Sequence, residues 1–186
     1  MAEIGMQYPV WAEMETESTY KTGMVMGKAV SASLNWQKED NELYGDDAVA
    51  ETDQSLTGYT LDLSTTYLEE GVESAVLGYT ETSGGEFEIT DADPPYGGCG
   101  YIRVLKRNNT RLYKAVWYPK IQFGSPNETS NTKQRSISWG TPTISGKGLA
   151  VLNGSGKNRF RLQQVFTTLA GAKAYLDAKA NISSGG

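Results

Sequence analysis

The fold class of this chain follows from one central stretch, residues 94–123, which reads PPYGGCGYIRVLKRNNTRLYKAVWYPKIQF. It contains two alternating runs rich in Val, Ile, Tyr and Trp, the residues that favour strands. Asn108 and Asn109 separate the runs, and asparagine tolerates the positive φ angles of a tight turn. The stretch therefore predicts a long antiparallel β-hairpin near the middle of the protein.

Large side chains occupy both faces of the second run of this hairpin. The two sets are Tyr113, Ala115 and Trp117 on one side and Leu112, Val116 and Tyr118 on the other. A strand of this kind is covered on both faces, so we expect the core on one face and a helix or a neighbouring subunit on the other. Pro119 lacks a backbone N–H and predicts an edge or a bulge.

Further strands are predicted before and after the hairpin. Alternation marks residues 24–36, 55–64 and 135–152, and a short strand is expected at 86–90. The expected apolar positions are Met24, Met26, Val30, Ala32, Leu34, Trp36, Tyr59, Leu61, Leu63, Ile137, Trp139, Ile144, Leu149 and Val151. Residues 1–22 are expected to be extended or irregular.

Two segments change from alternation to helical spacing. The first, residues 65–79, is expected to begin at a cap formed by Ser64 or Thr65. The second lies at 167–180, before a tail at 181–186 that is expected to fray. The pattern therefore predicts a mainly β protein of the α+β class, with one internal helix and a short C-terminal helix, in a single domain spanning the whole chain.

An acidic segment, residues 37–54, separates two predicted strands and reads QKEDNELYGDDAVAETDQ. Long polar connections are either solvated or functional. One interpretation is a solvated loop. The other is an arm that reaches a neighbouring subunit and becomes ordered there, with Leu43, Tyr44 and Val49 as its apolar anchors.

Charge is unevenly divided along the chain. Residues 1–93 carry 20 Asp and Glu against 3 Lys and Arg, which gives −17, and residues 94–186 carry 2 against 14, which gives +12. Together these return the net charge of −5. Halves that interleave in the fold neutralise each other, whereas halves that occupy different surfaces favour head-to-tail or side-to-side self-association.

Residues that carry catalytic or metal chemistry are scarce. The chain has no His and a single Cys, Cys99, so the commonest acid–base group, the commonest metal ligand and any intrachain disulfide are missing. Cys99 is expected to be a small buried residue. No phosphate-loop, zinc or calcium-loop spacing is present. We therefore expect neither an enzyme nor a bound cofactor or metal.

Other function classes are also disfavoured by the sequence. Basic and aromatic residues mix in the central hairpin, but a nucleic-acid binder is usually basic overall. There is no N-terminal signal peptide and no apolar stretch of about 18 residues. We expect a soluble chain, made in a cytoplasm and without contact with a membrane.

Several segments, taken in order, resemble the major tail proteins of siphophages, which build the tail tube. The resemblance covers roughly residues 4–180, and it rests on the ordered set because the family has no catalytic signature. The matching segments are GKAVSASLNW (27–36), ELYGDDAVAE (42–51), LTGYTLDLSTTYLEEGVESAVLGY (56–79), the central hairpin with its continuation to FGSP (94–126), TKQRSISWGTPTISGKG (132–148) and FTTLAGAKAYLDA (166–178).

The resemblance implies a β-sandwich or open barrel flanked by helix, and a function in assembly. Subunits of this family close into rings, usually hexamers, which stack into a tube around the tape-measure protein. The implied partners are further copies of the chain, tape-measure and tail-terminator proteins, and DNA in transient, non-specific passage. The implied location is the virion tail, assembled in the host bacterial cytoplasm. Leu43, Tyr44, Asp46 and Asp47 then belong to an intersubunit loop.

A second function class competes with this one. A carbohydrate-binding or adhesive β-sandwich module of a virion or cell surface would present aromatic rings as a platform for sugars. Trp11, Trp36, Trp117 and Trp139 are the candidates for that platform. Their exposure in the folded protein discriminates between the two classes.

Overall fold

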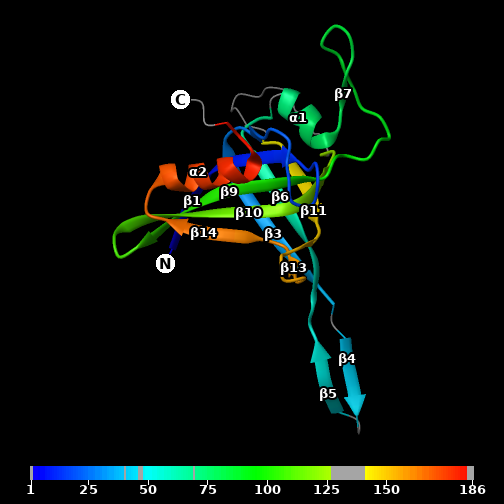
Figure 1. Ribbon diagram of the computed structural model, residues 1–186, viewed down its shortest axis with the longest axis vertical. Helices are drawn as coiled ribbons and strands as arrows, with labels where there is room; N and C mark the ends of the chain where they lie inside the picture. Colours follow the sequence, from blue (N-terminus) through cyan, green and yellow to red (C-terminus); the bar gives the residue numbers. More distant parts are fainter. Residues whose placement is uncertain (1, 40, 46–47, 69, 127–140, 184–186) are drawn as a thin grey trace, which may run out of the picture.

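The computed structural model describes residues 2–39, 41–45, 48–68, 70–126 and 141–183. Within these residues the protein has one large antiparallel sheet, three two-stranded ladders and two short helices (Figure 1). The predicted fold class is confirmed at this level: a mainly β protein with one internal and one C-terminal helix.

The large sheet has eight strands in the order β2-β1-β9-β10-β11-β6-β3, and β14 also pairs with β10. Its strands are β1 (Ala2–Glu13), β2 (Met24–Val25), β3 (Ala29–Lys38), β6 (Leu56–Thr65), β9 (Gly97–Arg107), β10 (Thr110–Gly124), β11 (Thr143–Gly148) and β14 (Leu162–Phe166). The other elements are α1 (Glu70–Leu77), α2 (Leu169–Ala180) and the ladders β4 (Asn41–Gly45) with β5 (Ala48–Asp53), β7 (Thr80–Glu81) with β8 (Phe87–Glu88), and β12 (Val151–Leu152) with β13 (Asn158–Arg159).

The predicted central hairpin is confirmed as β9 and β10. Its turn residues Asn108 and Asn109 have φ angles of 46° and 64°, the positive values that a tight hairpin turn requires. The irregularity predicted at Pro119 is confirmed as well, because the register with β9 shifts between Tyr118 and Ile121. Before this bulge β10 pairs with β14, and after it β10 pairs with β11.

The sheet curls until β3 contacts β1, and it encloses the larger of two cores. Tyr59, Leu61 and Leu63 of β6 are fully buried there, as their alternation predicts. Packing is tight, since a Cβ added to Gly148 would lie 1.8 Å from Cζ of Tyr59. Other buried members come from β1, α1, β9, β10 and β11: Trp11, Val72, Val76, Cys99, Tyr118, Phe123 and Ile144.

A second core lies on the opposite face of β1, β9 and β10, beneath α2 (Figure 1). Ala115 and Trp117 of β10 are buried against Ala172 and Leu176 of α2. The strand β10 is therefore covered on both faces, as predicted, and α2 is the element that covers the second one.

Both ends of α2 are capped by the chain itself. The hydroxyl of Thr168 accepts a hydrogen bond from the Gly171 N–H at 3.2 Å. Asn181 adopts the left-handed conformation after the helix, and the Ile182 N–H donates to the Asp177 carbonyl at 2.9 Å. The first two residues of the tail predicted to fray are thus held in place.

The internal helix begins later than the sequence indicates. Ser64 and Thr65, the predicted caps, remain in β6 and pair with Thr143 of β11 and Ala29 of β3. Backbone pairing with two neighbouring strands outweighs the local capping signal. Gly78, with a φ angle of 76°, follows the end of the helix.

Residues 1–22 were expected to be extended or irregular, and residues 2–13 are extended as the long paired strand β1, whose pairing the sequence did not reveal. The strand is hidden in the sequence because Tyr8 has a φ angle of 58° and the register shifts between Gln7 and Val10. This bulge interrupts the alternation that would reveal the strand. A similar shift at β3 leaves Val30 48% exposed, although alternation predicts it on the apolar face.

The apolar positions predicted within residues 135–152 have mixed outcomes. Ile144 and Val151 are buried as predicted, but Leu149 is 43% exposed. Ile137 and Trp139 lie outside the described residues. The strand β14 was not predicted, because its polar Gln pair conceals the alternation.

Candidate assembly surfaces

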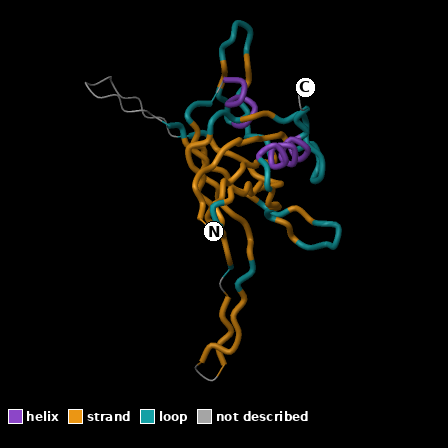
Figure 2. The backbone as a smooth tube through the Cα atoms, turned by 90° about the vertical axis from the view of Figure 1, so that its left-hand side faces the viewer, coloured by secondary structure: helices purple, strands orange, loops and turns teal. Residues whose placement is uncertain are grey.

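The first candidate surface is the hairpin arm, which consists of β4 and β5. It continues from the β3–β6 pair and extends away from the body of the subunit in both views (Figure 1, Figure 2). Apart from a few weak contacts with other elements, the strands β4 and β5 contact only each other. A lone two-stranded hairpin is marginally stable in water, so this element lacks a packing partner within the part of the subunit described above.

The predicted intersubunit residues fall on this arm. Leu43 and Tyr44 lie in β4, where they pair with Glu51 and Val49 of β5. Asp46 and Asp47 lie outside the described residues. The segment predicted as an extended loop is therefore a pair of strands over most of its length. The Gly45 turn signal was present in the sequence, but the two strands show no alternation and the density of acidic residues favoured a loop.

The second candidate surface is the acidic arm, residues 80–93, which projects from the opposite end of the body (Figure 2). Only two residue pairs join its strands β7 and β8. Its carboxylates are all exposed, and Ile89 is the most exposed large apolar side chain among the described residues, at 65%. The acidic side chains are Glu81, Glu86, Glu88, Asp91 and Asp93.

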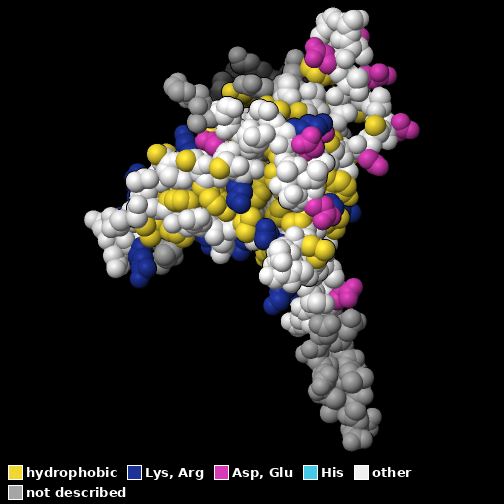
Figure 3. All heavy atoms as spheres, in the orientation of Figure 1, with side chains coloured by type: hydrophobic (Ala, Val, Ile, Leu, Met, Phe, Trp, Pro, Cys, Tyr) yellow, Lys and Arg dark blue, Asp and Glu magenta, His cyan; other side chains and the backbone are white. Residues whose placement is uncertain are grey.

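Charge differs between the acidic arm and the body. The sequence has no Lys or Arg between residues 39 and 102, so the acidic arm carries carboxylates and no cation. Figure 3 shows acidic side chains along the acidic arm, whereas basic and acidic ones occur together on the body below it. Two ion pairs join described side chains of the body, Lys21 with Glu13 at 2.5 Å and Arg103 with Glu3. The uneven charge of the sequence thus leaves one projecting surface without any basic side chain.

The third candidate surface is the seam groove, a hollow of about 510 Å³ between β1 and β3. Arg103, paired with Glu3, and Arg161 line it, with the Tyr101 and Tyr118 rings deeper inside. The pair with Arg103 lowers the pKa of Glu3. The Arg161 guanidinium lies 5.3 Å from the centre of the Trp36 ring. Half-buried Lys114 stands directly opposite Arg103 on the same face of the sheet.

Burial and like charge act together on Lys114. Its pKa is lowered, first by burial and then by the neighbouring guanidinium groups of Arg161 and Arg103. The negative charge of Glu3 raises the pKa of Lys114, but it does not cancel the lowering by burial and by the two guanidinium groups. The seam groove is therefore a place where positive charge exceeds negative charge among the described side chains.

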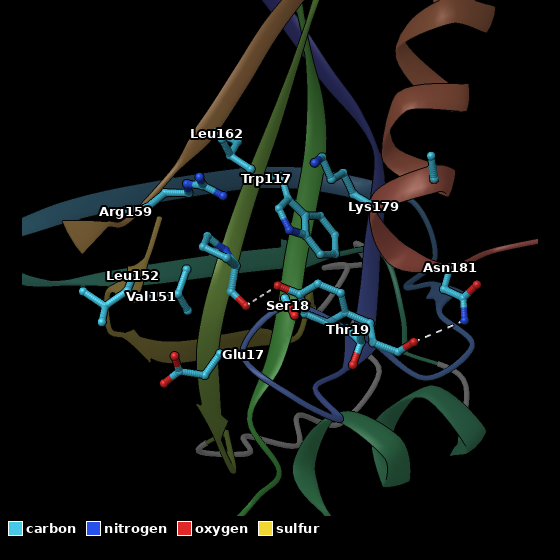
Figure 4. Close-up of a pocket in the computed structure, with 13 residues that line it drawn as sticks. Glu17, Ser18, Thr19, Trp117, Val151, Leu152, Arg159, Leu162, Lys179 and Asn181 are labelled. Carbon is cyan, nitrogen blue, oxygen red and sulfur yellow. Dashed lines mark hydrogen bonds between the residues drawn. The ribbon is translucent and has the colours of Figure 1, made fainter. Parts of the chain in front are cut away.

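A separate pocket of about 480 Å³ lies between the C-terminal end of α2, β10 and the β12–β13 ladder (Figure 4). Trp117 forms its floor and packs edge-to-face with Tyr20, at 5.3 Å between ring centres. The Tyr20 hydroxyl donates to the Pro119 carbonyl at 2.6 Å, and the Asn181 side chain donates to the Tyr20 carbonyl at 3.2 Å. These bonds fix the 14–20 loop against the body rather than presenting free groups to a substrate.

The side chains described here offer little catalytic chemistry. Cys99 is fully buried, and burial raises the pKa of its thiol to about 12, which opposes formation of the reactive thiolate. No group of three Asp, Glu, Cys or His side chains with metal-binding geometry occurs among the described residues. Burial also raises the pKa values of Tyr59 and Tyr101.

The tryptophan platform required by a sugar-binding module is largely absent. Trp11 and Trp117 are each 1% exposed. Trp36 is half-buried and already carries the Arg161 guanidinium, while Trp139 lies outside the described residues. Trp11 and Trp117, two of the four candidates for such a platform, instead fill the cores and present no ring to a sugar.

Comparison with known proteins gives no family for this chain. No family model matches it, and no curated protein matches it. Neither helix in the described part of the chain is long and apolar enough to span a membrane.

Proposed function

We propose that this chain is a structural virion protein, the major tail tube subunit of a long-tailed bacteriophage. It self-assembles into stacked rings, with six subunits per ring as the family resemblance implies, and these form the conduit for DNA ejection. The observation that carries the proposal is the hairpin arm, a strand pair that extends from the body and whose strands contact mainly each other among the described elements. An element of this kind gains its stability from a neighbour.

Two further observations support assembly as the function. The described strands β3 and β14 each pair on one side only, and such unpaired edges are a hazard unless a partner covers them. A heterologous interface joins unlike surfaces of neighbouring subunits. It closes into a ring when the rotation from one subunit to the next adds up to a full turn. In this proposal the tape-measure and tail-terminator proteins are further partners, and an acidic lumen repels DNA phosphates so that the DNA slides.

The proposal assigns no catalytic step and no cofactor to the chain. The Cys99 thiol is buried, its pKa is raised to about 12, and the sequence has no His to act as its base. Binding between copies is then the whole of the mechanism. The virion tail is the proposed location, with assembly in the host bacterial cytoplasm.

The test replaces residues 40–53 with a short Gly–Ser turn that joins β3 directly to β6. We expect the wild-type protein to form rings or tubes in negative-stain electron microscopy. The shortened protein should keep its circular dichroism and thermal unfolding and yet fail to assemble. A wild-type protein that stays monomeric at high concentration and at every salt concentration would overturn the proposal.

A further inference from the structure

The seam groove and its edge carry positive charge that the described side chains there do not balance: Arg103 and Arg161 line the groove, and Lys114 lies beside it. Arg103 and Lys114 stand directly opposite each other on β9 and β10, an arrangement in which like charges repel. Arg161 adds a third cation, which stacks on Trp36. Glu3 is the single carboxylate among the described residues that line the groove. A negatively charged partner would relieve this repulsion.

The groove also lies between two strand edges that are open for pairing. β1 pairs with β9 on one side, and on the other it pairs with β2 only at Val10 and Trp11. β3 pairs with β6, and no second ladder joins it among the described strands. An extended segment entering the groove can therefore use main-chain hydrogen bonds as well as charge.

The chain itself contains a segment that fits these requirements. Residues 86–93 of the acidic arm read EFEITDAD and include four carboxylates and no cation. After Glu88 the segment leaves its short ladder with β7, and residues 89–93 join no ladder among the described strands. Ile89 is 65% exposed, and the groove offers Met6, Ala32 and Leu34 as an apolar wall.

We propose that the seam groove of one subunit receives the acidic arm of a second copy of this chain. Residues 86–93 lie as an extended segment between β1 and β3, and their carboxylates face Arg103, Lys114 and Arg161. This contact rests on the self-assembly proposed above and names the surfaces that perform it.

The arrangement must be intermolecular. The acidic arm projects above α1, whereas the N-terminal half of β1 lies at the other end of the body, and the two views agree on this separation (Figure 1, Figure 2). Arm and groove are different surfaces, so each subunit offers one of each. Repeated from subunit to subunit, such a heterologous contact closes into rings or extends into chains.

The experiment uses full-length protein with charge reversals on each side of the contact. The groove variant is Lys114→Glu with Arg161→Glu, and the arm variant is Glu86→Lys, Glu88→Lys and Asp91→Lys. Lys106→Glu with Arg107→Glu is the matched control, because these exposed cations lie on β9 outside the groove. Circular dichroism establishes that each variant is folded, and light scattering after size exclusion measures association.

We expect each variant alone to self-associate about tenfold or more weakly than wild type, while the control associates as wild type does. An equal mixture of groove and arm variants should assemble although neither does alone, because the wild-type arm of one fits the wild-type groove of the other and the reversed arm fits the reversed groove. A chain carrying both sets of reversals should assemble again, because the signs are exchanged. This rescue keeps the test valid even if one variant is less stable.

Other outcomes overturn the contact in distinguishable ways. Rings that form equally well from either variant would refute the arm–groove contact and leave the proposed tube function standing. A wild-type protein that never self-associates refutes both. Binding of a single-stranded oligonucleotide by a monomer, lost in the groove variant and kept in the arm variant, would assign the groove to nucleic acid instead.

Discussion

The layer formed by β1, β9 and β10 and the two arms all consist of paired strands or contain them, yet they stand in opposite environments. The layer is covered on one face by the curled sheet and on the other by α2. The strands of the arms contact mainly each other in the described part of the chain. Burial of apolar surface stabilises the layer, whereas the acidic arm contributes exposed carboxylates. The stability of the subunit and its association with other subunits thus depend on different residues.

The largest expected effect on stability, which tests this contrast, is at Trp117 in the layer. Trp117→Ala removes a side chain that is 1% exposed and should lower the free energy of unfolding by about 3–5 kcal/mol. Ile89→Ala in the acidic arm should change it by less than about 0.5 kcal/mol. Urea unfolding followed by tryptophan fluorescence and circular dichroism measures both. Equal losses would show that the arm is part of the cooperative core.

The sequence predicted the central hairpin of the layer, β9 and β10, well because its signals are local. Alternation across β9 and β10, the Asn108–Asn109 turn and the Pro119 bulge all act within a few residues. The prediction that both faces are covered followed from the size of the alternating side chains. What covers the second face could not be deduced, since α2 reaches it from far along the chain.

Prediction was weaker wherever distant partners decide the conformation. β1 is broken by the bulge at Tyr8, so its alternation is lost although pairing with β9 holds it as a strand. Ser64 and Thr65 carry a capping signal that two neighbouring strands override. The seam groove had no local signal, because Glu3, Arg103 and Arg161 come together only when the sheet curls.

A second contrast concerns two glycines, one in the core wall and one in an exposed turn. Gly148→Ala places a methyl group against the Tyr59 ring and should cost about 1–3 kcal/mol of the free energy of unfolding. Gly154→Ala, in the turn between β12 and β13, meets no atom within 4 Å and should be nearly neutral. Thermal unfolding of the two variants compares them directly, and similar melting temperatures would contradict the tight packing around Tyr59.

A smaller effect is expected at the start of α2, the helix that separates the layer from solvent. Thr168→Ala removes the acceptor for the Gly171 N–H and should lower the free energy of unfolding by about 1 kcal/mol. Thr168→Ser keeps a hydroxyl in the same place and should retain most of the stability. If the serine variant lost as much as the alanine variant, the cap would not be the cause.

The smallest expected effect is a pH dependence at the contact between β1 and α2. The Tyr8 hydroxyl donates to a carboxylate oxygen of Asp177 at 2.8 Å, and Lys173 lies over its ring. Burial raises the pKa of Tyr8 to about 12, with the hydrogen bond to Asp177 and the negative charge of Asp177 as further causes. The unfolded chain ionises this group near pH 10, so unfolding releases a proton between these two values.

It follows that the contribution of Tyr8 is fully present below pH 10 and is lost as the pH rises towards 12. Tyr8→Phe removes the hydroxyl, so the difference in free energy of unfolding between the two proteins should be constant below pH 10 and narrow above it. Urea unfolding at a series of pH values measures this difference. The other tyrosines with raised pKa values titrate alike in both proteins and cancel. A difference that stays constant to pH 12 would mean that the Asp177 contact does not hold Tyr8 neutral, and that α2 is fixed to the layer by packing alone.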